Sequence, residues 1–490
     1  MPDALPTAGD VAAMPLHDGA WGACQVTGVT EHSLVVVALA WHSPQPPQLD
    51  DLAGVGPLIL DHHNWLGQPE HSNVSIEDPV PAEFVWLGKL PVPAELDAMP
   101  NSYQGWGGFT LQVVAQHDWD QLPEAVRSGY RAGATRGPVE VDFGAGPVRK
   151  LGATSRLDLT GDDPAMPADG EVRWSALDRL PQCSGLVWAG PDRGLAAALR
   201  DRPLIDSLAW RDPPSTVDLR GTSLEHITLD GRVTDLHLPR SLRNLSLAGQ
   251  GSGMAVTAPD DGRWLELSLE TDGPHPSVPA GLRRIRTLTI TGRGTVSAMP
   301  LRGLTELRTL WLRWQGPPGE LLDADSLADL GHLTVLKLQD AYGLAAHTLP
   351  DLPSLRHLDV YGLRRSITKP LRARYRHIRL VLHGAKSDTW LAANLDNPLR
   401  DWVDGDEKAG RAACKAYAET VRALDKAREP DQARPILQAL VDKLNAIEER
   451  YQIIDTIRRE QAGDAFVALA TKAGVPNDTA DEWFDDWRDF

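Results

Sequence analysis

The chain has 490 residues, enough for about two to four domains, and its 42% hydrophobic and 24% charged residues are typical of an ordinary globular protein. The formal net charge of −18 argues against a nucleic-acid partner, because no basic patch would attract phosphates, and it favours a basic partner if any. Three distant cysteines, Cys24, Cys183 and Cys414, exclude a disulfide framework or a CxxC zinc site. The first 15 residues lack the apolar core of a signal peptide, and no apolar run is long enough to cross a bilayer, so we expect a cytoplasmic protein without a membrane segment.

Residues 1–125 predict a small β domain. Short runs rich in β-branched and aromatic residues are separated by proline- and glycine-rich breakers, and Asp18-Gly19 between two apolar runs is a hairpin signal. The runs expected as strands are Val11–Leu16, Ala23–Val29, Ser33–Trp41, Phe84–Leu90 and Phe109–Ala115.

Several motifs of this domain resemble the Immunity protein 26 family of bacterial polymorphic-toxin systems. They are Gly9-Asp10-Val11, Met14-Pro15-Leu16, Asp18-Gly19-Ala20-Trp21-Gly22, and Trp86-Leu87-Gly88 followed by Pro91. The resemblance spans roughly residues 7–120 and departs from the family at Ala12-Ala13, where an aromatic is more usual. It implies a non-catalytic domain that neutralises a toxin by binding it.

Residues 126–150, broken by Gly144-Ala145-Gly146-Pro147, are expected to be a linker, and residues 151–385 carry a leucine ladder. The ladder repeats apolar-x-x-apolar-x-apolar, with clear repeats that start at Leu242, Trp264, Ile285, Leu307, Leu333 and Leu355. Successive starts are 22, 21, 22, 26 and 22 residues apart. Such a period predicts a solenoid with one short strand per turn, and the longer units should return through a helix or 3₁₀ turn, as at Ala324–Leu330.

The ladder resembles a leucine-rich-repeat protein over about residues 155–385. The family's usual asparagine after the last core position is replaced, for example by Gln250, which suggests an irregular arc. Near the middle, Val217, Ile227, Leu236 and Leu245 are only 10, 9 and 9 residues apart, so tight turns are expected there.

The side chain between the two core residues of each strand should point to the concave face of such a solenoid. Early turns place small or polar residues there, such as Asp218 and His237. Later turns gather residue types that dominate protein interfaces. We therefore predict a partner-binding site made of Trp311, Arg313, Lys337, Gln339, Asp359 and Tyr361. The alternative is that Trp311 folds under a neighbouring loop.

Residues 386–490 predict a helical C-terminal domain, because apolar residues recur at helical spacing. The expected helices are Ala409–Ala427, Asp431–Tyr451 and Asp455–Ala473. The fold class expected for the whole chain is thus α+β multidomain, with a small β domain, an irregular leucine-rich-repeat-like solenoid and a helical domain.

The best candidate for a metal site is Asp61-His62-His63 with His71 nearby. Adjacent histidines point apart on a strand, and the chain has neither an HExxH motif nor a GxSxG motif. We therefore expect no metal, cofactor or catalytic residue.

Function follows from these expectations as three alternatives. The first is a non-enzymatic protein-binding protein, which the N-terminal resemblance implies is an immunity protein that neutralises a toxin by steric binding. The second is a general scaffold or signalling adaptor that uses the repeat region. The third, and least favoured, is an enzyme with a dispersed active site around His62, His63 or His71.

Overall fold

The computed structural model describes residues 5–76, 78, 80–93, 96, 100–135, 137–160, 164–250, 253–427 and 432–490. The chain forms two compact units. Unit 1 comprises Met1–Leu265 and Pro279–Leu282, and unit 2 comprises Glu266–Val278 and Arg283–Phe490.

Unit 1 begins with a five-stranded antiparallel sheet in the order β6-β3-β2-β1-β7. Its strands are β1 (Asp10–Pro15), β2 (Trp21–Val29), β3 (Ser33–Ala38), β6 (His71–Ser75) and β7 (Val85–Lys89). Smaller elements beside it are η1 (Leu49–Leu52), β4 (Ile59–Leu60) and β5 (Gln68–Pro69). Four of the five strands expected from the sequence are confirmed.

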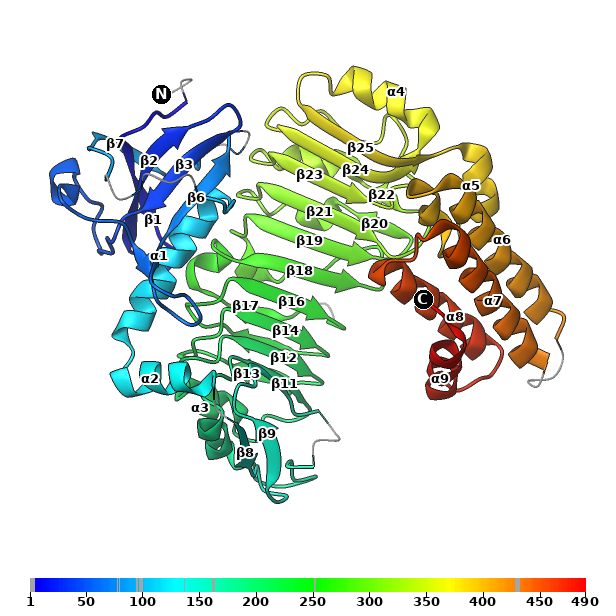
Figure 1. Ribbon diagram of the computed structural model, residues 1–490. Helices are drawn as coiled ribbons and strands as arrows, with labels where there is room; N and C mark the ends of the chain where they lie inside the picture. The colour runs from blue at the N-terminus through cyan, green and yellow to red at the C-terminus, as the bar shows by residue number, and fades with distance from the viewer. Residues whose placement is uncertain are drawn as a thin grey trace. The chain divides into compact units, whose positions relative to one another are not determined.

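The fifth expected strand, Phe109–Ala115, is wrong, since it lies inside helix α1 (Trp106–Gln121). The buried residues Trp106, Phe109 and Val113 are three and four positions apart, which places them on one face of a helix. They pack in one hydrophobic core with residues of the sheet. The N-terminal region is therefore a sheet covered by a helix, as Figure 1 shows, rather than β structure alone.

Residues 126–150, expected as a linker, contain most of helix α2 (Glu124–Gly133) and the strands β8 (Pro138–Val141) and β9 (Val148–Leu151). These two strands form an antiparallel hairpin. The glycine- and proline-rich segment after Phe143 is its turn.

The expected fold class is wrong in its central part: the ladder does not form a solenoid but one large parallel sheet of eleven strands, as in α/β proteins. Its order is β10-β11-β12-β14-β16-β18-β19-β21-β23-β24-β25. In unit 1 the strands are β10 (Arg156–Asp158), β11 (Gly185–Ala189), β12 (Ser207–Arg211), β14 (His226–Asp230) and β16 (Asn244–Ala248). In unit 2 they are β18 (Glu266–Thr271), β19 (Thr287–Gly292), β21 (Thr309–Trp314), β23 (Val335–Gln339), β24 (His357–Arg364) and β25 (Arg379–Lys386).

The leucine ladder determines only where strands begin and which side chains are buried, and this is why it could not establish a solenoid. Consecutive core pairs lie in register, such as Leu288 beside Leu310, so β19 is paired with β21 over all six of its residues, Thr287–Gly292. Periodicity does not determine how the segments between strands fold. Those segments contain η3 (Trp174–Arg179), α3 (Leu195–Arg200), η4 (Pro259–Gly262), η5 (Ala280–Leu282), η6 (Met299–Leu301), η7 (Ala324–Asp329) and α4 (Arg365–Arg374). The 3₁₀ turn expected at Ala324–Leu330 is confirmed by η7.

Core residues near Val217 are only nine or ten positions apart in the sequence because successive strands there belong alternately to two different sheets. Strands β13 (Thr216–Asp218), β15 (Asp235–His237) and β17 (Ala255–Thr257) form a separate three-stranded parallel sheet. Strands β20 (Thr295–Ser297) and β22 (Glu320–Leu322) pair in the same way in unit 2. Asp218 and His237 therefore do not share a face with the later residues of the ladder, contrary to the prediction.

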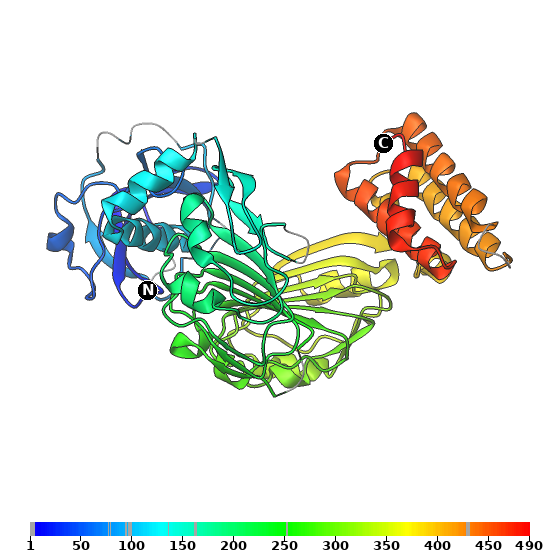
Figure 2. The ribbon, with the colours of Figure 1, turned by 90° about the horizontal axis from the view of Figure 1, so that it is seen from below.

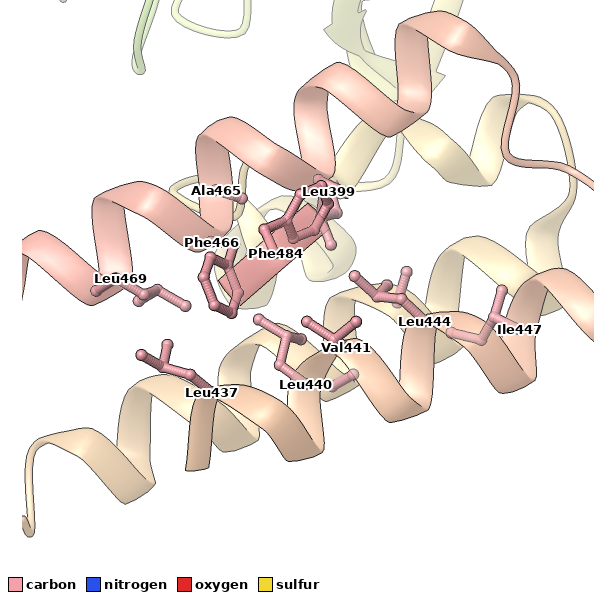
Figure 3. Packing of buried hydrophobic residues seen from close by; sticks show 14 of the residues in the cluster. Leu399, Leu437, Leu440, Val441, Leu444, Ile447, Ala465, Phe466, Leu469 and Phe484 are labelled. Carbon is pink, nitrogen blue, oxygen red and sulfur yellow. The ribbon is translucent and has the colours of Figure 1, made fainter. Parts of the chain in front are cut away.

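Unit 2 ends in helices, which lie side by side in Figure 2. They are α5 (Asp388–Asn394), η8 (Arg400–Asp404), α6 (Glu407–Leu424), α7 (Ala433–Tyr451), α8 (Thr456–Lys472) and α9 (Asn477–Trp487). The three expected helices are confirmed, although Asp431, the expected start of the second, lies outside the described residues. Leu437, Leu440 and Leu444 of α7 face Phe466 of α8 in a continuous apolar core (Figure 3).

Candidate functional site

All six residues predicted to bind a partner lie on three neighbouring strands of unit 2, β21, β23 and β24 (Figure 1). The strand register sets them in two rows. The first row is Trp311, Lys337 and Asp359, and the second is Arg313, Gln339 and Tyr361. Because side chains two apart on a strand point to the same side, both rows share one face of the sheet. We call these six residues the tryptophan face.

The opposite side of the same strands is buried. Between the positions of the tryptophan face, each strand contributes leucine or valine side chains that are almost fully inaccessible. They are Leu310, Leu312, Leu336, Leu338, Leu358 and Val360. The tryptophan face is therefore held on a hydrogen-bonded backbone with a packed underside, which keeps its side chains in a fixed spacing.

Trp311 is partly buried, and two cations contact its ring. The Arg313 guanidinium carbon is 5.0 Å from the centroid of the indole, and the Lys337 ammonium is 5.6 Å from it. Each cation–π contact contributes about 0.5–1 kcal/mol at an exposed site. These contacts from neighbouring strand positions hold the indole on the sheet face, with Arg313 exposed beside it.

Tyr361 closes the face next to a group of charged residues. Its side chain is 37% exposed, and burial, reinforced by Asp401 and Asp404, raises its pKa to about 12. The ammonium of Lys386, only 4% exposed, pairs with Asp404 and lies 3.4 Å from an Asp401 carboxylate oxygen. A phenol and a buried cation therefore meet two carboxylates of η8 here.

The same charged group continues toward the end of β23. The Tyr342 hydroxyl donates to Asp401 at 2.8 Å, and Arg400 lies 3.4 Å from an oxygen of Asp340. Burial, and then the charge of Asp401, raises the pKa of Asp340 to about 6, against the opposing effect of Arg400. We call Asp340, Tyr342, Lys386, Arg400, Asp401 and Asp404 the ion cluster. Sequence reasoning missed it, because its members are spread over 65 positions, from 340 to 404, without periodicity.

The fold separates His71 from the other predicted histidines, whereas His62 and His63 lie in contact, with their Nδ1 atoms 3.1 Å apart. His62 Nε2 is 2.8 Å from Gln112 Oε1, whereas His71 Nε2 is 2.9 Å from Thr27 Oγ1. Burial lowers the pKa of both imidazoles. In the described ranges, no three His, Cys, Asp or Glu residues are grouped so that they could hold a metal ion. The three cysteines are buried as free thiols.

A cleft of about 400 Å³ in unit 1 is a second concave feature that sequence reasoning did not find. It is lined by Asp118, Asp206, Glu225 and His63, and Glu225 pairs with Arg243 at 3.4 Å. Burial raises the pKa of Asp118, and burial together with Glu225 raises that of Asp206 to about 6. Burial lowers the pKa of His63 to about 4. Asp206 therefore holds its proton to a higher pH than an exposed carboxyl does.

No family model matches the chain, and no curated protein matches it. The resemblances to Immunity protein 26 and to leucine-rich-repeat proteins thus rest on the motifs alone. Within the described residues, no helix is long and apolar enough to cross a membrane.

Proposed function

We propose that this chain is a non-enzymatic protein-binding protein, and that the tryptophan face holds its partner. The single observation that carries the proposal is that Trp311 and Arg313 of β21 share one sheet face with Tyr361, which lies two strands away on β24. These residue types account for most of the binding energy in protein interfaces. Trp311 is only partly buried, so the open part of its indole adds apolar contact area.

The nature of the partner is proposed from the N-terminal resemblance. If the likeness to Immunity protein 26 reflects common function, the partner is a bacterial toxin, and occupying the toxin's working surface neutralises it. A cytoplasmic location belongs to this proposal, because three free buried thiols suit a reducing compartment. The alternative is a scaffold or adaptor with no toxin involved. A toxin gene next to the gene for this chain favours the immunity hypothesis. If the purified protein binds no product of such a gene, the adaptor hypothesis is the one that remains.

Affinity capture from the native cell extract tests the proposed surface. We expect Trp311→Ala and Arg313→Ala each to lose the protein that the unchanged chain captures, by about tenfold or more for a central hot-spot residue. The matched control is Met299→Ala, which trims an exposed apolar side chain elsewhere in unit 2. Capture that survives both face substitutions moves the site away from the tryptophan face and contradicts the proposal.

A further inference from the structure

The charges of the tryptophan face are opposite in sign to those of the chain as a whole. The protein carries a formal charge of −18, yet the centre of the face carries the two cations Arg313 and Lys337 around one indole. Among the residues that the structure describes, neither cation forms an ion pair within 4.0 Å. Arg313 is exposed and Lys337 partly exposed, and neither is in contact with a carboxylate of the described residues, although Asp359 is the neighbour of Lys337 on the next strand.

The neighbouring positions on the same face confine this positive charge. On the β19 side the two rows continue with Thr289 and Thr291, which are uncharged. Glu270 of β18 follows one strand further, beside Thr291. On the other side Lys337 is followed by Asp359. From β18 to β24 the face therefore carries a negative charge at Glu270, none on β19, the two cations on β21 and β23, and a negative charge at Asp359.

We propose that the partner is a protein that places an acidic segment on Arg313 and Lys337, with a carboxylate beside the Trp311 ring. This inference rests on the proposed function, because it names the chemistry of the partner for the same face. A carboxylate offers two oxygens to the guanidinium fork of Arg313 and a third contact to the ammonium of Lys337. Asp359 and Glu270 then repel acidic residues that are placed out of register, which restricts how the segment lies.

A nucleic acid fits the face less well. Base stacking needs an open aromatic ring, whereas the indole of Trp311 is already contacted by two cations. A long polyanion would also be repelled by the chain's net charge of −18. The acidic protein segment is therefore the occupant that we argue for, and an oligonucleotide becomes an arm of the test.

The test uses the full chain and a fluorescein-labelled octaglutamate peptide, with binding followed by fluorescence anisotropy at low and at physiological salt. The double variant Arg313→Glu and Lys337→Glu should weaken binding by about tenfold or more, because it replaces two attractive contacts by two repulsive ones. The matched control is the double variant Lys369→Glu and Arg372→Glu, which makes the same change of charge at exposed positions of α4. It should change the dissociation constant by no more than about twofold, because a distant exposed charge is screened within about 10 Å. Asp359→Asn should tighten binding.

Several results would overturn the inference. They are no binding of octaglutamate, equal binding to both double variants, or tighter binding of octalysine or of a ten-residue oligothymidine. Circular dichroism spectra that match the unchanged chain show that the variants remain folded. If octaglutamate fails but Trp311→Ala still abolishes capture from the extract, the acidic chemistry is wrong and the proposed function stands. If Trp311→Ala leaves capture unchanged, the proposed function itself fails.

Discussion

The hydroxyl of Tyr342 donates a hydrogen bond to the Asp401 carboxylate at 2.8 Å and so joins the segment after β23 to η8. The phenol is fully buried, and burial together with the Asp401 charge holds its pKa above the usual range. The hydroxyl therefore stays protonated at neutral pH, where it can donate to Asp401. Arg400 lies over the Tyr342 ring, with its guanidinium carbon 5.3 Å from the ring centre.

Tyr342→Phe removes this donor while keeping the ring. We expect the free energy of unfolding to fall by about 1.5–3 kcal/mol, the usual range for a hydrogen bond to a charged group. Urea unfolding followed by circular dichroism measures the change. Tyr103→Phe is the matched control, because its side chain is 75% exposed and its hydroxyl can be replaced without burying an unpaired group. Equal stability of the two variants would show that the Tyr342 hydroxyl contributes nothing to folding.

Lys386→Met tests the cation of the ion cluster. The substitution keeps an unbranched apolar stem but leaves Asp401 and Asp404 without their buried partner, so we expect a loss of about 3–5 kcal/mol. Lys443→Met makes the same change at a solvent-exposed pair, where Lys443 lies 2.7 Å from Glu419. That control should lose no more than about 1 kcal/mol. Thermal unfolding of both variants compares them directly, and similar losses would contradict the role given to burial.

The pKa of Asp340 predicts a pH-dependent contribution to stability. Burial, and then Asp401, raises that pKa from 3.8 to about 6, so between about pH 4 and 6 the folded chain holds a proton that the unfolded chain has released. The contribution of Asp340 to stability is therefore greatest at the acidic end and declines as the pH rises through 6.

Asp340→Asn removes this titration, and asparagine tolerates the positive φ of 61° at the position. The stability of the variant relative to the unchanged chain should rise between pH 4 and 6, by at most about 1.4 kcal/mol per pH unit. Urea titrations at intervals of half a pH unit measure this difference. A difference that stays constant across the window would mean that Asp340 titrates as an ordinary exposed carboxyl.

The six residues of the tryptophan face could be predicted because they depend on strand periodicity alone. Once Leu310 and Leu312 are assigned to the core, Trp311 must point to the other side, and parallel register then brings Lys337 and Asp359 beside it. The sheet itself could not be predicted in the same way. Val217 and Ile227 have the same local pattern but belong to different sheets, and only the folded backbone separates them.

Other features depended on contacts between distant residues. Gln250, which replaces the asparagine usual in leucine-rich repeats, accepts a hydrogen bond from the Val233 amide at 3.0 Å and donates one to the Ala248 carbonyl at 3.1 Å. A longer side chain thus ties neighbouring segments where a less rigid arrangement was expected. The misassigned strand at Phe109 had a usable signal, since Trp106, Phe109 and Val113 follow helical spacing. The ion cluster had none, because its charges become partners only after η8 packs near the end of the sheet.

Leu440→Ala tests whether the apolar face of α7 stabilises the C-terminal helices. Leu440 is 1% exposed and lies in the core with Phe466 and Phe484 (Figure 3). The truncation should cost about 2–5 kcal/mol, because it removes buried methyl groups and leaves a cavity that fixed helices fill only in part. Gln438→Ala lies on the exposed side of the same helix, and should change stability by less than about 0.5 kcal/mol, since alanine favours the helix and no core contact is lost.

Hydrogen exchange of α7, measured by mass spectrometry, shows where the Leu440→Ala substitution weakens the structure. Faster exchange in α7 and α8 of Leu440→Ala, with unchanged exchange in β21 and β23, is the expected result. Equal protection of α7 in the two variants would mean that the helices are held by their polar surface contacts instead.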